Sequence, residues 1–128
     1  MANILLIEPD HILAATYGEA LRSGGHQVAV CSGAQAAIFA ADTTPPDVVI
    51  LELQLIEHSG IEFLYEFRSY PEWQAVPVLV LSHVPPMEFN ASLGMLRREL
   101  GVQAYHYKPH TSLRRLLTAI NHLVPAAA

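Results

Sequence analysis

Short unbroken runs of apolar residues recur along the chain between stretches of mixed polarity. Three of them, at residues 4–7, 48–51 and 78–81, contain no polar position. A run of this length without alternation is typical of a strand that is covered on both faces, as in a parallel sheet. Weaker candidates lie at residues 28–30 and 104–107. The pattern therefore predicts five strands, three of them buried on both sides.

Between these runs the apolar residues follow helical spacing, which places them on one face of each helix. The residues that share a face are Leu13, Tyr17, Ala20 and Leu21, then Phe63, Leu64 and Phe67, and last Leu113, Leu116, Leu117, Ile120 and Val124. A helix of small residues is expected at 34–41, and Thr111 or Ser112 is expected to cap the last helix. Strands that alternate with helices predict an α/β fold, a doubly wound sheet with helices on both faces.

Composition narrows the class of protein. The chain has 128 residues, of which 52% are hydrophobic and 15% charged, so we expect residues 1–128 to form a single globular domain. No apolar run is long enough to span a membrane, and the start lacks the pattern of a secretory signal. A single cysteine, Cys31, fits a reducing cytoplasm. The net charge of −5 argues weakly against direct contact with nucleic acid.

The strand ends collect the residues that carry chemistry. Glu8, Pro9 and Asp10 follow the first predicted strand, and Glu52 follows the third. Ser82 and His83 end the fourth strand, and Lys108, the only lysine, ends the fifth. Because parallel strands end at the same edge of a sheet, these side chains should gather at one rim. Lys108 placed opposite Glu52 becomes a candidate for an internal ion pair.

In this order the residues resemble the response-regulator receiver domain. Residues 4–10 look like the opening strand and acidic turn of that family, and residues 47–53 look like the strand that carries its phosphoaccepting aspartate. Ser82 falls on the family's Ser/Thr position, Lys108 on its lysine, and Tyr105 on the aromatic residue that rotates on activation in many members. The resemblance covers nearly the whole chain, and it implies a CheY-like, flavodoxin-like fold with five parallel strands in the order 2-1-3-4-5.

Three departures from the family's pattern point to an atypical member, a pseudo-receiver. Glu52 stands where the family has its phosphoacceptor aspartate, and the extra methylene moves the carboxylate by roughly 1.3 Å. Pro9 stands at the family's main magnesium-ligand position, so we expect weak Mg²⁺ binding or none, and no other cofactor. His83 replaces the small residue that usually leaves room for the phosphoryl group. We therefore expect a signalling module that binds proteins without being phosphorylated, and no enzyme activity.

Several alternatives stay open at this point. Glu52 either mimics a phosphoryl oxygen and holds a constitutive conformation, or is a relic that pairs with Lys108 in an inactive-like state. A divergent receiver that is still phosphorylated on Glu52 or Asp10 is the second interpretation, and a flavodoxin-like enzyme or ligand-binding domain is the third. A metal site built from His58 and His83 with the acids of the rim is also conceivable. Nucleotide-binding loops and nucleophile elbows are absent from the sequence.

The last third of the chain suggests an interaction surface. Up to Pro85 two arginines accompany ten acids, whereas beyond it five basic residues accompany only two acids. In receivers generally, the fourth helix, fifth strand and fifth helix contact partners or a second copy. The residues expected on this face are Arg97, Arg98, Arg114 and Arg115, with Leu96, Tyr105 and Tyr107 as its apolar centre. An acidic protein partner or a homodimer would fit such a face.

Overall fold

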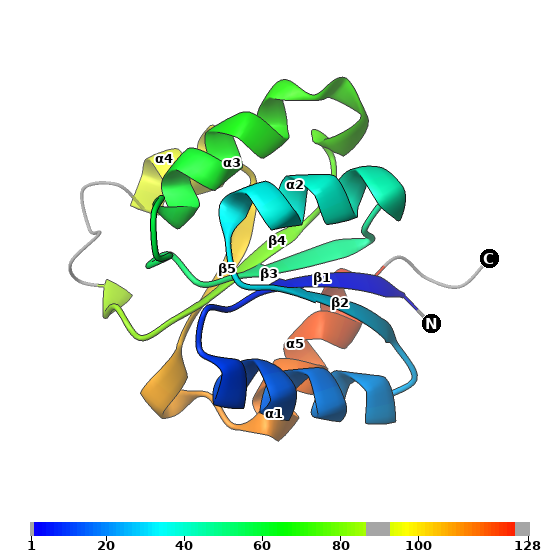
Figure 1. The fold of residues 1–128 in the computed structure, drawn as a ribbon. Helices are drawn as coiled ribbons and strands as arrows, with labels where there is room; N and C mark the ends of the chain where they lie inside the picture. The colour runs from blue at the N-terminus through cyan, green and yellow to red at the C-terminus, as the bar shows by residue number, and fades with distance from the viewer. Residues whose placement is uncertain (1, 87–92, 125–128) are drawn as a thin grey trace.

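The computed structural model describes residues 2–86 and 93–124, and it contains one sheet of five parallel strands in the order β2-β1-β3-β4-β5 (Figure 1). The strands are β1 (Asn3–Ile7), β2 (Gln27–Cys31), β3 (Val48–Leu51), β4 (Val78–Ser82) and β5 (Val102–Tyr107). Each predicted apolar run lies within one of these strands, so the predicted number and order of strands are confirmed.

Helices cover both faces of the sheet, as Figure 1 shows. Helices α1 (His11–Ser23) and α5 (Leu113–Leu123) lie on one face, and α2 (Ala34–Thr43), α3 (Gly60–Ser69) and α4 (Leu93–Arg98) lie on the other. Two short 3₁₀ turns, η1 (Pro71–Trp73) and η3 (Lys108–His110), connect the elements. None of the helices within the described ranges is long and apolar enough to cross a membrane.

The alternation of side chains along the central strands builds two separate cores. Leu5, Val49 and Val80 point to the side of α2 and α3, where Phe63, Phe67 and Trp73 pack against them. The neighbouring positions point to the side of α1 and α5 and form a second cluster, which contains Ile4, Leu6, Ile50, Leu79, Tyr17, Leu21, Leu116 and Ile120. Both faces of β1, β3 and β4 are therefore buried, which explains the unbroken apolar runs at residues 4–7, 48–51 and 78–81.

Polar side chains define where several helices begin. Asp10 Oδ1 accepts hydrogen bonds from the backbone N–H groups of Ile12 and Leu13, 2.9 and 3.0 Å away, and so caps α1. Ser59 caps α3 and Ser112 caps α5 in the same way. The predicted cap of the last helix is thus confirmed at Ser112. These caps fix the points at which the chain leaves the carboxyl ends of the strands.

Candidate functional site at the carboxyl ends of the strands

Four side chains from four different strands meet at the carboxyl rim of the sheet. Glu8 follows β1, Glu52 follows β3, Ser82 is the last residue of β4, and Lys108 follows β5. Glu8, Glu52 and Ser82 are almost completely buried, with exposed fractions of 3%, 1% and 0%. The rim therefore holds charged groups in a part of the molecule from which water is excluded.

Lys108 is shared between the two buried carboxylates. Its Nζ atom lies 2.6 Å from Glu8 Oε1 and also 2.6 Å from Glu52 Oε1. The sequence suggested the pair with Glu52, but it did not identify Glu8 as a second and equally close partner. Two carboxylates around one ammonium give the cluster a net charge of −1, so further donors are needed to stabilise it.

Those donors converge on Glu52. Its Oε2 atom accepts hydrogen bonds from the Ser82 hydroxyl and, at 3.2 Å, from the backbone N–H of Gln54. On Oε1, beside Lys108 Nζ, the backbone N–H of His83 donates at 3.3 Å, and His83 Nδ1 lies 2.8 Å away. The His83 side chain is 56% exposed. Both oxygens of a single buried carboxylate are thus occupied by donors.

The surroundings shift the pKa values of this ion pair. Burial acts to raise the pKa of Glu52, but the hydrogen bonds from Lys108, Ser82 and Gln54 outweigh it, and the pKa lies below its ordinary value. Burial likewise acts to lower the pKa of Lys108, but its hydrogen bonds to Glu52 and Glu8 outweigh that effect and raise the pKa. Both groups are therefore charged at neutral pH.

The loop after β3 holds Glu52 in place through a tight backbone contact. The N–H of Gly60 donates to the Leu53 carbonyl at 2.7 Å, and Gln54 pairs with Ser59 as an isolated antiparallel bridge. A Cβ atom on Gly60 would lie 2.8 Å from the Leu53 Cα and 2.9 Å from the Glu52 carbonyl oxygen. Only glycine allows this approach, which explains the glycine that opens α3.

A second chain of contacts runs from the rim towards β5. Ser82 Oγ accepts a hydrogen bond of 3.1 Å from the Val84 N–H, and the Val84 carbonyl accepts one of 2.7 Å from the Tyr105 hydroxyl. Tyr105 itself is half-buried against the core on the α2–α3 side. The backbone at Val84 therefore connects Ser82 with Tyr105, a link that the sequence did not predict.

Asp10 does not join the cluster at the rim. Its side chain is exposed and caps α1, and only its backbone N–H reaches the cluster, donating to Glu8 Oε2 at 3.2 Å. This corrects the expectation that Asp10 would share a pocket with Glu8. The sequence did contain the signal, because an aspartate directly before a helix is a favoured N-cap residue.

The carboxylates at and beside the rim already have partners within the chain. Pro9 offers no side-chain ligand, the Asp10 carboxylate is used as a cap, and the carboxylates of Glu8 and Glu52 are bound to Lys108. Across residues 2–86 and 93–124, no group of three or more histidine, cysteine, aspartate or glutamate side chains is arranged to hold a metal ion. His58, considered above as a partner of His83, instead lies 3.3 Å from Glu62 on α3.

The expected interaction face is basic, but one of its residues is not on the surface. Arg97, Arg98, Arg114 and Arg115 are exposed, and Tyr107 is half-buried. Leu96 corrects the expectation: its exposed fraction is 0%, and it packs in the core on the α3 side, because the short helix α4 turns this one position inward. A hollow of about 520 Å³ also lies on this face and is lined by His106, Ser112, Arg114, Arg115, Thr118 and Ala119.

Comparison with known proteins identifies relatives of this chain. Residues 4–121 match the family model described as the response regulator receiver domain. The chain is 38% identical to the transcriptional regulatory protein KdpE of Mycobacterium tuberculosis over 99% of its own length and 54% of that protein. It is 37% identical to the KDP operon transcriptional regulatory protein KdpE of Escherichia coli, over 64% of this chain and 35% of that protein. The chain thus spans about half or less of these relatives.

Solved structures show the same fold at low sequence identity. The chemotaxis protein CheY4 of Vibrio cholerae superimposes with a TM-score of 0.84 at 19% identity, covering 97% of this chain and 99% of that one. The non-phosphorylated HemR receiver domain of Leptospira biflexa gives a TM-score of 0.83 at 22% identity, covering 100% and 98%. The five-stranded sheet and its surrounding helices are therefore those of the CheY-like fold.

Proposed function

This chain belongs to the response regulator receiver domain family, and we propose that it is a member that signals through protein contacts without being phosphorylated. In this proposal Glu52 stands at the position of the phosphoacceptor, and its carboxylate stays bound to Lys108 and Ser82 in place of a phosphoryl group. The family assignment rests on the match over residues 4–121. The proposal about phosphorylation rests on the geometry of Glu52.

The observation that carries the proposal is the saturation of the Glu52 carboxylate. A carboxylate that attacks a phosphoryl donor must expose an oxygen to that donor in line with the leaving group. Glu52 is 1% exposed, and its oxygens already accept from Lys108, Ser82 and backbone N–H groups. His83 Nδ1 also lies 2.8 Å from Glu52 Oε1. Reaction at Glu52 would first require these contacts to break.

The same contacts favour the mimic over the relic. A relic that merely neutralised Lys108 would need only that ion pair. Glu52 also accepts from the Ser82 hydroxyl and the His83 N–H, donors from the end of β4 that would otherwise be available to an incoming anion. Its charge of −1 is smaller than the roughly −1.5 to −2 of a phosphoryl group, so the mimicry is partial. Ser82 and Tyr105, joined through Val84, would then be held in one arrangement.

Output in this proposal passes through contacts with proteins on the α4–β5–α5 face. Exposed arginines surround the hollow beside His106, and the half-buried Tyr107 supplies apolar area. Exposed ion pairs contribute only about 0.2–1 kcal/mol each, so the arginines select an acidic partner more than they hold it. The relatives named as transcriptional regulators are longer than this chain, and their activity is extended to it only as part of this proposal.

The experiment that tests the proposal is incubation with acetyl phosphate and Mg²⁺, followed by intact mass spectrometry. We expect no added phosphoryl group, while an active receiver treated in parallel is labelled. The matched variant is Glu52→Asp combined with Pro9→Asp, which restores the family's residues at both positions and should gain label. A phosphoryl adduct on the unmodified chain that disappears in Glu52→Gln or Asp10→Asn would show instead a working, divergent phosphoacceptor.

The interaction face has its own test in the salt dependence of association. Binding of an acidic protein, or self-association through this face, should weaken as ionic strength rises from about 50 to 500 mM, because exposed charges are screened. Arg114→Ala combined with Arg115→Ala should remove most of that dependence. Association that is unaffected by salt and by these substitutions would argue against this face.

A further inference from the structure

One edge of the sheet is formed by β2. Its five residues, Gln27–Cys31, include no charged side chain. Most of the strand is exposed, and Val30 is 42% exposed. Open edge strands normally carry charged residues, prolines or bulges that discourage pairing with another chain. An uncharged, regular edge strand is therefore a candidate for pairing.

The hydrogen bonds between β2 and the chain at β1 show which backbone groups of β2 face outward. The Gln27 N–H donates to the Ala2 carbonyl, and the Cys31 carbonyl accepts from the Glu8 N–H, each at 2.9 Å. The backbone N–H and C=O groups at these positions point to β1. Because the direction of these groups alternates along a strand, those of Val28 and Val30 point away from the sheet. In the described part of the chain no strand lies beside them.

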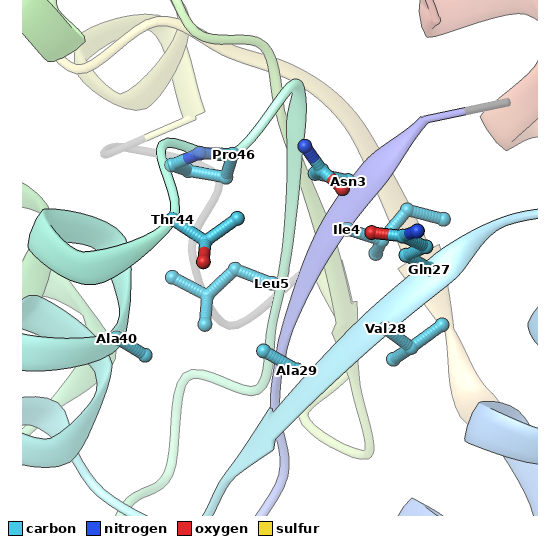
Figure 2. A pocket seen from close by; sticks show the side chains of 9 residues that line it. All are labelled: Asn3, Ile4, Leu5, Gln27, Val28, Ala29, Ala40, Thr44 and Pro46. Carbon is cyan, nitrogen blue, oxygen red and sulfur yellow. The ribbon is translucent and has the colours of Figure 1, made fainter.

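Small residues of both neighbouring helices lie beside this edge. On the α1 side Gly18 lies close to the strand, and a Cβ atom on it would lie 3.6 Å from Val30 Cγ2. On the α2 side a hollow of about 150 Å³ opens beside the strand (Figure 2). Figure 2 shows Ala29 and Leu5 facing Ala40 and Thr44 across this hollow. Gly18, Ala29 and Ala40 therefore add little bulk beside the strand.

We propose that β2 is a self-association site, at which a second copy of this chain adds its own β2 in antiparallel orientation about a two-fold axis at Ala29. This register places Val28 of one copy opposite Val30 of the other. Both residues face outward, so each such pair exchanges two N–H···O=C hydrogen bonds across the axis. The result is one continuous sheet through two copies, independent of the phosphorylation state and of the α4–β5–α5 face.

Self-complementarity is the reason to choose a second copy over an unrelated strand. Two-fold symmetry brings like residues near one another, so a charged edge strand would repel its own copy. Here Ala29 meets Ala29 on the axis, and Gln27 meets Cys31, with no charge on either strand. On the α2 side, Cys31 of the second copy would lie next to Gln27 and the hollow shown in Figure 2.

Arg22 competes with this pairing. Its guanidinium, reaching over from α1, donates a hydrogen bond of 3.1 Å to the Val28 carbonyl, one of the acceptors that the second copy would need. Arg22 must therefore be displaced before the ladder can close. A ladder this short is also a small interface, so the dimer is expected to be weak and to depend on concentration. Removing Arg22 should strengthen it.

The register is tested by disulfide crosslinking with single cysteines in a Cys31→Ser background. Ala29→Cys places two thiols opposite each other in a non-hydrogen-bonded pair, where Cα atoms are about 4.5 Å apart, within the range a disulfide spans. Val30→Cys is the matched control, since its thiol lies on the same exposed strand but its copies are diagonal, about 7–8 Å apart. Under mild oxidation we expect Ala29→Cys to crosslink at least several-fold faster than Val30→Cys.

Equal or faster crosslinking of Val30→Cys, or the absence of crosslinks in both variants while far-UV circular dichroism shows them folded, would overturn the proposal. Sedimentation equilibrium on chains with native Cys31 under reducing conditions gives an independent measurement. Arg22→Ala should raise the fraction of dimer, with little dependence on salt. Val30→Lys should lower it, because the added charges repel one another across the axis. An Arg22→Ala variant that stays monomeric at several hundred micromolar would also overturn it.

Discussion

The polar side chains at the two ends of the sheet make different kinds of contact. At the amino end, Asp47 Oδ2 accepts from the Asn3 N–H at 2.8 Å, and His26 Nδ1 accepts from the Ala2 N–H at 3.3 Å. Each side chain there satisfies a backbone donor where a strand begins. At the carboxyl end, Glu8 and Glu52 share Lys108, and the exposed fractions of the three side chains are 3%, 1% and 9%.

The difference indicates that the polar groups at the carboxyl end are not explained by the stability of the fold alone. Unpaired backbone groups at a strand end are costly, so the hydrogen bonds at the amino end need no further explanation. Three buried charges are different, because an apolar cluster of the same volume is often equally stable or more so. The carboxyl end thus carries chemistry that the fold alone does not require, and substitutions should affect the two ends to different degrees.

The largest effect is expected from Lys108→Met. Removing the ammonium leaves two carboxylates buried side by side without a cation, and breaking such a pair typically costs about 3–5 kcal/mol of the free energy of unfolding. Urea unfolding at neutral pH measures this loss. Because protonation of a carboxylate relieves the repulsion, the loss should be smaller at acidic pH than at neutral pH.

Arg97→Met is the matched control for that substitution. Arg97 is an exposed cation on α4, and its replacement should change the free energy of unfolding by no more than about 0.5 kcal/mol. Equal losses in the free energy of unfolding for the two variants would contradict this prediction. The ammonium of Lys108 would then contribute no more to stability than an exposed surface charge.

Glu52→Gln should have a smaller effect, a loss of about 1–3 kcal/mol. The amide keeps the shape of the side chain, but its NH₂ group replaces an acceptor where Ser82 and Gln54 supply donors. Lys108 retains Glu8, so no buried charge is left alone. Thermal and urea unfolding should agree on the loss. A variant that is more stable than the original chain would show that the contacts to Glu52 do not offset its burial.

Acid should weaken the carboxyl end more gently than either substitution. The pKa of Glu52 is lowered in the folded chain, so its contribution is present above its ordinary value of 4.5 and is lost as the pH falls through the folded pKa. The pKa of Lys108 is raised from 10.5, so its contribution is lost only as the pH rises through that higher folded value. Urea unfolding between about pH 3 and 7 should show an acid-side decline that is shallower in Glu52→Gln.

The sequence predicts the parts of this site that depend on where the strands end. It does not predict contacts that depend on the rotamer of a side chain. Strand ends follow from apolar runs, and so Glu52, Ser82 and Lys108 were expected at one rim, where the structure places them. The contact between His83 Nδ1 and Glu52 Oε1 depends on a side-chain rotamer, which no sequence pattern encodes. The inward turn of Leu96 was equally hidden, since arginines follow it directly and suggest a surface helix.

The smallest effect is expected at the amino end, from Asp47→Ala. This substitution removes the acceptor of the Asn3 N–H, a neutral donor that lies half-buried at the start of β1, where water can replace part of the bond. The expected loss in the free energy of unfolding is about 0.5–1.5 kcal/mol. Asp47→Asn keeps a carbonyl oxygen at the same place and should recover most of it, with little dependence on pH. If Asp47→Ala instead cost as much as Lys108→Met, the amino end would depend on its single carboxylate as strongly as the carboxyl end depends on its three buried charges, and the contrast between the two ends would fail.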